Sequence, residues 1–307
     1  MFIKKLTKQV ICNPEEPVVC TPNGKLRGLI VDGTYIFRGI KYCEARRFHL
    51  PEPAKSWEGV KEAIIYGPVC PEIQTVQPSD NYTVPHVFNP QDEDCQYLNI
   101  WTQSPDAGRK RPVLVWLHGG GFATGSGIEH FAYDGENMSR FGDVVVVTLN
   151  HRLNVLGFLD LSAYGEEYRY SANAGMADIV EALRWVQKNI EAFGGDPGNV
   201  TIFGQSGGGG KVAALLQMPS AAGLFHRAVI QSGIIRAHSG KAEDPDMARL
   251  LLDKLGITPE RIREIEEVPY YRFQQIISGL GPQAFMDFGP KRDNDLYMGS
   301  IFEAGIC

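Results

Sequence analysis

The segment that determines the fold reads Val200-Thr-Ile-Phe-Gly-Gln-Ser-Gly-Gly-Gly-Gly-Lys-Val-Ala-Ala-Leu-Leu-Gln217. Its first four residues form a short apolar run rich in β-branched and aromatic side chains, which predicts a buried strand. The residues from Lys211 onward predict a helix. Between strand and helix, Gly204-Gln-Ser-Gly-Gly208 fits the G-x-S-x-G nucleophile elbow, in which a serine lies on a strained turn. The pattern therefore predicts that the hydroxyl of Ser206 is exposed at the end of a sheet.

The two outer glycines of this elbow have a steric reason. A side chain at Gly204 or Gly208 would collide with the neighbouring strand and helix, and glycine also tolerates tight backbone geometry. The predicted helix points its free N–H groups and the positive end of its dipole at Ser206. We therefore expect a reactive serine at a helix N-terminus.

A second segment supplies what such a serine needs. Pro112-Val-Leu-Val-Trp-Leu117 is another predicted buried strand, and it runs directly into His118-Gly-Gly-Gly-Phe122. This match to the HGGG motif predicts a loop whose backbone N–H groups line an oxyanion hole, together with the N–H that follows the nucleophile. Glycine is required because the backbone itself approaches the substrate carbonyl. One such donor contributes roughly 3–4 kcal/mol of transition-state stabilisation.

Further segments surround these two motifs in a recognisable order. They are Arg47-Phe48 with Pro51, Trp57–Val60, Glu93–Trp101, Asn150–Leu153 with Leu156–Phe158, Asn173–Gly175 with Asp178, Ala182–Val186 and Phe193–Pro197. In this order the chain resembles the type B carboxylesterases, the cholinesterase-like and para-nitrobenzyl esterase-like family of the α/β-hydrolase fold, from near residue 17 to about 235. The resemblance implies an α/β protein of that fold, with this chain as its N-terminal part, truncated at the C-terminus.

The resemblance also implies roles for individual residues. Ser206 is the expected nucleophile of a serine carboxylic ester hydrolase that acts through an acyl-enzyme, and Gly120, Gly121 and Gly207 are the expected oxyanion donors. Two positions depart from the family pattern, since Gln205 replaces the usual Glu and Gly207 the usual Ala. The loss of a carboxylate beside the nucleophile removes a charge that would stabilise a protonated catalytic histidine. We expect a changed pH dependence or rate, and a less preorganised oxyanion hole at the more flexible Gly207.

The catalytic base and its acid have no evident candidates. In α/β-hydrolases the acid and then the histidine follow the serine, and in this family both lie well beyond the elbow, whereas this sequence stops at Cys307. His238 lies in a polar turn, His226 opens a strand, and the remaining histidines precede the serine. We expect the chain alone to be a poor or inactive esterase, and a complementary polypeptide would supply the missing groups. A truncated inactive protein, or a non-catalytic interaction protein of the same fold, remains the alternative.

Composition agrees with a soluble enzyme and argues against other classes. A net charge of −6 with no basic stripe argues against a nucleic-acid partner, and no stretch approaches the roughly 20 apolar residues of a membrane-spanning helix. The basic start Met1–Val10 lacks the apolar region of a signal peptide, so we expect a cytoplasmic protein. The expected partner is a small-molecule carboxylic ester, and no cofactor is expected.

The six cysteines lack the C-x-x-C spacing of a zinc or redox site, so no metal is predicted. By the family resemblance, Cys70 and Cys95 correspond to a pair that forms a disulfide in secreted relatives. In the cytoplasm we expect thiols at both positions. The run Gln205–Val212 superficially resembles a phosphate-binding P-loop, but it lacks the first Gly and the Ser or Thr after Lys that this motif requires.

The order of elements predicts one domain over residues 1–307. Val18–Cys20, Arg27–Val31 and Tyr35–Gly39 predict an N-terminal antiparallel meander with a hairpin turn at Asp32-Gly33. Short apolar strands separated by loops and helices then predict a mostly parallel sheet with helices on both faces. These strands are Tyr97–Trp101, Val113–Leu117, Val144–Leu149, Val200–Phe203 and Ala228–Gln231. The last of them is expected to leave an uncovered sheet edge. Residues 243–280 are more charged and predict a helical cap segment. Arg152 and Asp178 are expected to form a structural ion pair.

Overall fold

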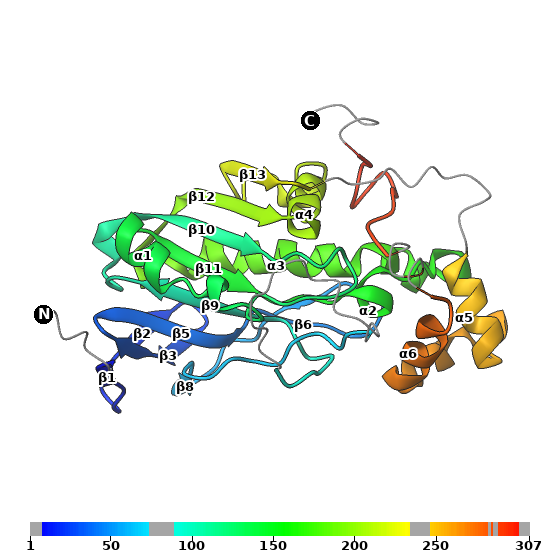
Figure 1. Cartoon of the computed structure of the whole chain (residues 1–307), viewed down its shortest axis with the longest axis horizontal. Coiled ribbons are helices and arrows are strands. Elements are labelled where there is room, and N and C mark those ends of the chain that lie inside the picture. The colour runs from blue at the N-terminus through cyan, green and yellow to red at the C-terminus, as the bar shows by residue number, and fades with distance from the viewer. Residues whose placement is uncertain (1–7, 74–88, 234–245, 282–283, 285–287, 301–307) are drawn as a thin grey trace, which may run out of the picture.

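A computed structural model describes residues 8–73, 89–233, 246–281, 284 and 288–300 (Figure 1). Its strands are β1 (Val10–Ile11), β2 (Val18–Thr21), β3 (Gly24–Arg27), β4 (Leu29–Val31), β5 (Thr34–Lys41), β6 (Cys43–Glu44), β7 (Glu52–Pro53), β8 (Val60–Glu62), β9 (Tyr97–Thr102), β10 (Arg111–Leu117), β11 (Val145–Leu149), β12 (Gly195–Gln205) and β13 (Arg227–Gln231). Its α-helices are α1 (Glu136–Gly142), α2 (Asn154–Phe158), α3 (Ala174–Asn189), α4 (Gly207–Leu215), α5 (Met247–Leu255) and α6 (Tyr270–Ser278). Short 3₁₀ turns complete it, the longest being η8 (Pro259–Glu267).

An eight-stranded sheet forms the centre of the described part, in the order β1-β4-β5-β9-β11-β10-β12-β13 (Figure 1). The four strands β11, β10, β12 and β13 run parallel to one another, as predicted. The first four strands of the order pair antiparallel, and β9 also pairs antiparallel with β11. The sheet is therefore mixed, and the prediction of a mostly parallel sheet is wrong for Tyr97–Trp101. A short hydrophobic strand does not reveal its direction, because burial on both faces suits either pairing.

The predicted N-terminal meander is divided between two sheets. Its second strand breaks at Gly28, where a Cβ would lie 2.4 Å from the carbonyl oxygen of Ile36. Strands β2 and β3 join β8 in a separate three-stranded sheet, whereas β4 and β5 belong to the large sheet. The hairpin at Asp32-Gly33 is confirmed: both residues have positive φ values, 47° and 86°, as a two-residue type I′ turn requires.

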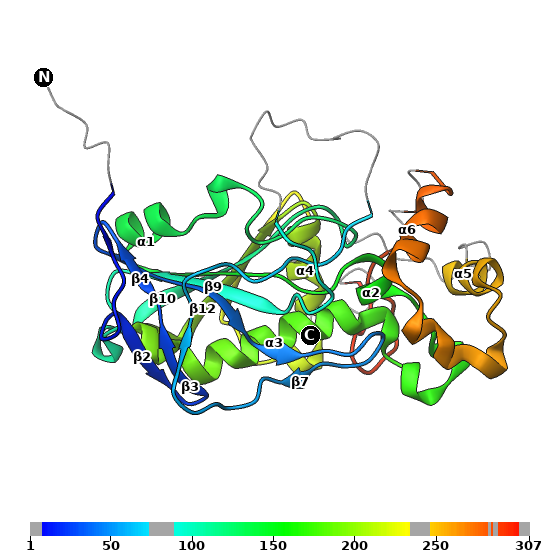
Figure 2. The ribbon, with the colours of Figure 1, turned by 90° about the horizontal axis from the view of Figure 1, so that it is seen from below.

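Helices cover both faces of the large sheet, with α1 on one side and α3 on the other (Figure 2). Along β11, Val145 and Val147 face the main core, and Val146 faces the smaller apolar cluster on the opposite side. This alternation is the period of two that a strand imposes on its side chains. On α3, Ile179, Leu183 and Val186 are fully buried, as their helical spacing predicts.

A buried ion pair ties α3 to the loop after β11. Arg152 and Asp178 form bonds of 2.8 Å (Nε–Oδ2) and 2.6 Å (Nη2–Oδ1), and the backbone N–H of Arg152 donates to the same carboxylate at 3.0 Å. Both side chains are almost fully buried. The predicted structural ion pair is confirmed.

The residues after 246 form a helical segment beyond α2, at one end of the molecule (Figures 1 and 2). It comprises α5, η8 and α6, in agreement with the predicted helices, although residues 243–245 lie outside the described residues. Arg47 donates to the carbonyl oxygens of Glu266 and Val268, and the Tyr270 hydroxyl donates to the carbonyl oxygen of Pro71 at 3.0 Å. These polar contacts join the segment to the sheet-bearing part.

Strand β13 is the last strand of the large sheet, next to β12. All five of its residues are exposed, and Val229 and Ile230 are 44% and 41% accessible. The predicted uncovered edge is therefore present among the described residues.

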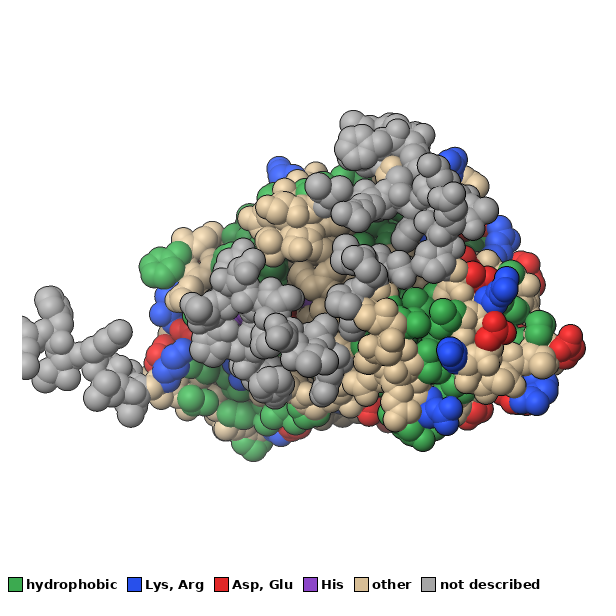
Figure 3. Space-filling view, turned by 45° about the vertical axis from the view of Figure 1, so that its right-hand side comes forward, with side chains coloured by type: hydrophobic (Ala, Val, Ile, Leu, Met, Phe, Trp, Pro, Cys, Tyr) green, Lys and Arg blue, Asp and Glu red, His purple; other side chains and the backbone are tan. Residues whose placement is uncertain are grey.

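Acidic and basic side chains are mixed on the face shown in Figure 3, with no basic stripe. None of the described helices combines the length and apolarity needed to cross a membrane.

Candidate active site

Ser206 lies on the turn between β12, which ends at Gln205, and α4, which begins at Gly207. Its backbone has φ 54° and ψ −122°, a strained conformation for a residue with a side chain. Hydrogen bonds hold the turn on both sides: Ser206 N donates to the carbonyl oxygen of Gln231 at 2.8 Å, and Gly210 N donates to that of Ser206 at 3.0 Å. Ser206 is solvent-exposed. The strand–serine–helix turn that the sequence predicts is present.

The glycines of the elbow lie where side chains would collide. A Cβ at Gly204 would lie 2.5 Å from the backbone of Gly208 and 2.7 Å from the carbonyl oxygen of Leu117. A Cβ at Gly208 would lie only 2.0 Å from that oxygen. The steric reason predicted for both glycines is confirmed, because β10 and α4 approach each other here without side chains between them.

The carbonyl oxygens of Gly119 and Gly120, in the glycine loop after β10, both accept hydrogen bonds. Nδ1 of His118 lies 2.9 Å from the carbonyl oxygen of Gly119, so this nitrogen carries the proton and donates. The carbonyl oxygen of Gly120 accepts from the backbone N–H of Thr124 at 3.1 Å and from its hydroxyl at 3.2 Å. In a planar trans peptide the N–H points opposite to the C=O. These bonds therefore direct the N–H of Gly120 away from the His118 ring and the N–H of Gly121 away from Thr124.

The loop and the elbow meet at two glycines. A Cβ at Gly207 would lie 2.3 Å from the carbonyl oxygen and 2.4 Å from the nitrogen of Gly121. Gly207 is therefore required by the contact between two backbones. On the other side of the serine, Oε1 of Gln205 would lie 3.5 Å from a Cβ at Gly119. The structure brings the predicted residues Gly120, Gly121, Gly207 and Gln205 together around Ser206.

Three basic side chains are buried behind this loop. His118 and His151, which follow the parallel strands β10 and β11, stack with ring centroids 5.1 Å apart. Burial, and next the charge of Lys211, holds the pKa of both imidazoles well below the ordinary value, so both rings are neutral. Nδ1 of His151 donates to the carbonyl oxygen of Arg152 at 2.8 Å. The Nε2 atoms of both rings find no partner among the described residues.

Lys211 comes from α4 and is fully buried. Its Nζ donates to the carbonyl oxygen of His118 at 2.9 Å and lies 5.8 Å from the centre of the Phe122 ring. Burial lowers the pKa of Lys211 to about 7, and the carboxylate of Glu129 opposes this shift.

Two further side chains support the loop from outside. The carboxylate of Glu72 accepts from Gly125 N at 2.7 Å. The amide of Asn154 donates to the carbonyl oxygen of Ala123 at 3.1 Å, and Asn154 N donates to that of Phe122 at 2.8 Å. The loop is thus fixed by several segments that are distant in the sequence.

Two of the described histidines make contacts that do not involve Ser206. His226 accepts from Val200 N in the middle of β12, and His49 lies 3.1 Å from the carboxylate of Glu266. His238 lies outside the described residues, as does Asp244. Asp246 caps α5 by accepting from Arg249 N at 3.0 Å, so this carboxylate serves the start of a helix. Among the described residues, no side chain is hydrogen-bonded to the Ser206 hydroxyl.

Cys70 and Cys95 are buried free thiols in the structure. Burial, and then the neighbouring Cys70, raises the pKa of the Cys95 thiol. Cys70 Sγ accepts from Leu153 N at 3.2 Å. The two sulfur atoms are thus neighbours in the reduced state, and a bridge on oxidation stays a prediction.

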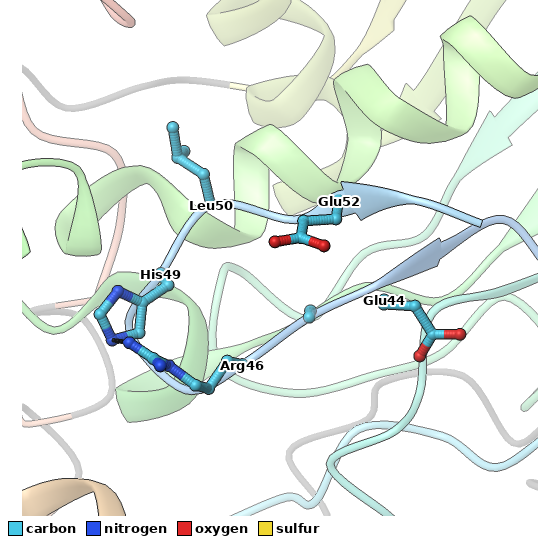
Figure 4. A pocket seen from close by; sticks show the side chains of 6 residues that line it. Glu44, Arg46, His49, Leu50 and Glu52 are labelled. Carbon is cyan, nitrogen blue, oxygen red and sulfur yellow. Dashed lines mark hydrogen bonds between the residues drawn. The ribbon is translucent and has the colours of Figure 1, made fainter. Parts of the chain in front are cut away.

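A cavity of about 440 Å³ lies on another part of the surface. It is lined by residues of the β6–β7 hairpin, among them Glu44, Arg46, His49 and Glu52 (Figure 4). None of its lining residues belongs to the elbow or the glycine loop. Because it offers charges of both signs and no nucleophile next to backbone donors, we do not regard it as the active site.

Comparison with known proteins agrees with this geometry. The sequence profile described as "Carboxylesterase family" matches residues 15–296. The chain belongs to the carboxylesterase family. It is 43% identical over 257 residues to the para-nitrobenzyl esterase of Bacillus subtilis, covering 82% of this chain and 50% of that protein. It is 46% identical over 222 residues to the phenmedipham hydrolase of Pseudarthrobacter oxydans, covering 70% and 43%.

Solved carboxylesterase structures share the fold. A Clostridium hathewayi esterase, described as able to hydrolyse aliphatic aromatic polyesters, is 51% identical with a TM-score of 0.89; the match covers 98% of this chain and 61% of that one. A thermophilic para-nitrobenzyl esterase gives a TM-score of 0.82 at 37% identity, covering 94% and 59%. The predicted α/β-hydrolase fold and family are confirmed. The chain spans about half the length of the curated relatives that it matches.

Sequence reasoning did not assign roles to Lys211, His151 or Glu72. A signal existed for the histidines, because His118 and His151 each follow a strand of the parallel part of the sheet, and the carboxyl ends of such strands meet at one edge. For Glu72 no sequence signal existed, since it lies 53 residues before the N–H that it binds.

Proposed function

We propose that the protein is a serine carboxylesterase in which Ser206 is the nucleophile. The observation that carries the proposal is the contact between the two glycine backbones beside an exposed, strained serine. A Cβ at Gly207 would lie 2.3 Å and 2.4 Å from the carbonyl oxygen and the nitrogen of Gly121, which supports a common set of donors from Gly120, Gly121 and Gly207. Such a group of backbone donors suits an oxygen that becomes negative during acyl transfer.

In the proposed reaction, the Ser206 hydroxyl attacks the carbonyl carbon of a carboxylic ester, and a base takes its proton. The carbonyl oxygen becomes an oxyanion that accepts hydrogen bonds from Gly120, Gly121 and Gly207. The C–O bond to the alcohol then breaks, the alcohol leaves with a proton, and an acyl-enzyme remains. Water attacks this ester, which releases the acid and restores the serine.

The base and its acid partner are proposed to come from a polypeptide segment other than the described residues. A serine hydroxyl is a weak nucleophile at neutral pH without an adjacent base.

We propose the helical segment 246–280 as a cap, and a small carboxylic ester as substrate. The cytoplasmic location stays a prediction. The alternative of a non-catalytic protein is not favoured, because the chain retains Ser206 and all three oxyanion glycines.

A fluorophosphonate probe tests the nucleophile directly. We expect the probe to label Ser206 when a polypeptide that supplies the acid and the histidine is present, and peptide mapping to place the adduct there. The Ser206→Ala variant serves as the matched control. Labelling that survives this substitution, or an adduct on another residue, contradicts the assignment.

Turnover of p-nitrophenyl butyrate tests the need for a second segment. We expect a kcat below about 1 s⁻¹ for the purified chain alone, under the usual enzyme range. Intact mass confirms the length of the chain. A higher kcat means that a base lies within this chain, and His238 is then the first residue to replace.

A further inference from the structure

Lys211 has no part in the proposed chemistry, yet it is buried completely in α4, five residues after the serine. A buried ammonium group is costly unless polar partners compensate for the lost water. The partner that the structure gives to Nζ is a backbone carbonyl, that of His118, at 2.9 Å. This carbonyl is the first of the glycine loop, so a bond within the protein links the nucleophile helix to that loop.

The carbonyls of the loop form a continuous series. Lys211 holds the carbonyl of His118, the ring of His118 holds that of Gly119, and Thr124 holds that of Gly120. Each bond fixes the plane of one peptide and thereby the direction of the N–H that follows it. Lys211 controls the first peptide, and the next two carry the N–H groups of Gly120 and Gly121. A rotation about the Cα–C bond of His118 would turn this carbonyl and also move the following peptides relative to the ring of His118.

We propose that Lys211 is a positioning residue that holds the oxyanion loop in register with the nucleophile helix. The inference rests on the proposed role of Ser206 and deepens it. Two contacts support the inference. The Lys211–His118 hydrogen bond joins α4 to the start of the glycine loop, and the contact of Gly207 with Gly121 joins α4 to the part of the loop that carries the proposed N–H donors.

The surroundings suit this task better than proton transfer to the serine. The groups that face Lys211 are the neutral rings of His118 and His151, the ring of Phe122 and the carboxylate of Glu129. Ser206 is exposed, whereas Lys211 has no exposed surface. Lys211 therefore acts on the loop from the protein interior.

Two substitutions of equal length separate the hydrogen bond from packing. Lys211→Met removes the donor, and Lys211→Gln keeps an N–H group. Leu215→Met, also buried in α4, is the control for repacking of the helix. All three are assayed with the complementing polypeptide present, by turnover of p-nitrophenyl butyrate, by inhibition with a trifluoromethyl ketone and by fluorophosphonate labelling.

For Lys211→Met we expect kcat to fall about tenfold, less than the loss of a direct donor, and KM to change less than about twofold. The inhibition constant of the trifluoromethyl ketone, whose adduct carries an oxyanion, should rise by the same factor as kcat falls. Lys211→Gln should recover part of both losses, and Leu215→Met should leave both unchanged.

Several results would overturn the proposal. One is an equal kcat in the unchanged protein and in Lys211→Met, and another is a rise in KM with no change in kcat. A third is that neither Lys211 variant folds, since Lys211 would then serve the fold alone. Failure of the proposed function looks different: the unchanged protein would not be labelled at Ser206 at all. Labelling of the unchanged protein with no effect of Lys211→Met rejects only this inference.

Discussion

At the scale of single residues, the oxyanion loop depends on backbone conformations that side chains disfavour. Gly120 and Gly121 have φ values of 82° and 63°, in the left-handed region. A Cβ at Gly121 would meet no atom closer than 4.0 Å. Strain of the backbone, rather than lack of space, is therefore what excludes larger residues at Gly121.

Replacing Gly121 by Val should cut kcat of the complemented enzyme by about 10²-fold or more, the usual effect of one lost donor. A β-branched residue disfavours positive φ, so the N–H turns away from the oxyanion, whereas substrate binding changes less. Steady-state kinetics with p-nitrophenyl butyrate measure both constants. A near-normal kcat with a raised KM would mean that the loop only shapes the pocket.

The burial of Lys211 also predicts a pH dependence of stability. Its pKa falls from an ordinary value near 10.5 to about 7 in the folded protein. Between these two values the unfolded chain binds more protons than the folded one, so the free energy of unfolding rises with pH. The cost of burying the charge is largest below pH 7 and disappears above the unfolded pKa.

Urea unfolding at pH 7, 8 and 9 tests this dependence. The difference in unfolding free energy between the unchanged protein and Lys211→Met should change in favour of the unchanged protein, by at most about 1.4 kcal/mol per pH unit. Taking the difference removes the contribution of all other titrating groups. A difference that stays constant over this range would show that the buried lysine does not titrate there.

At the scale of elements, the Arg152–Asp178 pair joins α3 to the carboxyl end of β11. Replacing Asp178 by Ala leaves a buried guanidinium without its carboxylate, which should cost about 3–5 kcal/mol of unfolding free energy. Denaturant unfolding measures the loss. Glu264→Ala is the control, because the Arg261–Glu264 pair is about half exposed on both sides and should contribute less than about 1 kcal/mol. Equal losses in the two variants would contradict a special role of the buried pair.

At the scale of the whole molecule, the exposed edge at β13 is a surface open to association. Val229 and Ile230 offer apolar side chains on an edge strand, which natural proteins protect with charged residues such as lysine. Ile230→Lys should therefore reduce concentration-dependent association of the chain, measured by light scattering. Phe141→Lys is the control, since Phe141 is 86% exposed on α1, away from this edge. An equal reduction in both variants would mean that exposed apolar surface in general drives association.

The sequence by itself determined the strand–serine–helix turn at Ser206, the glycine loop after His118, the helix face of α3 and the Asp32-Gly33 hairpin. These features depend on residues that are close in the chain, so local periodicity and glycine geometry suffice. Only the tertiary structure decided the antiparallel pairing of β9, the division of the N-terminal strands between two sheets and the contact of Gly207 with Gly121. It also decided the burial of Lys211 under the carbonyl of His118, a residue 93 positions earlier. Such features join segments that are distant in the chain. They depend on how these segments pack together, which a short stretch of sequence does not specify.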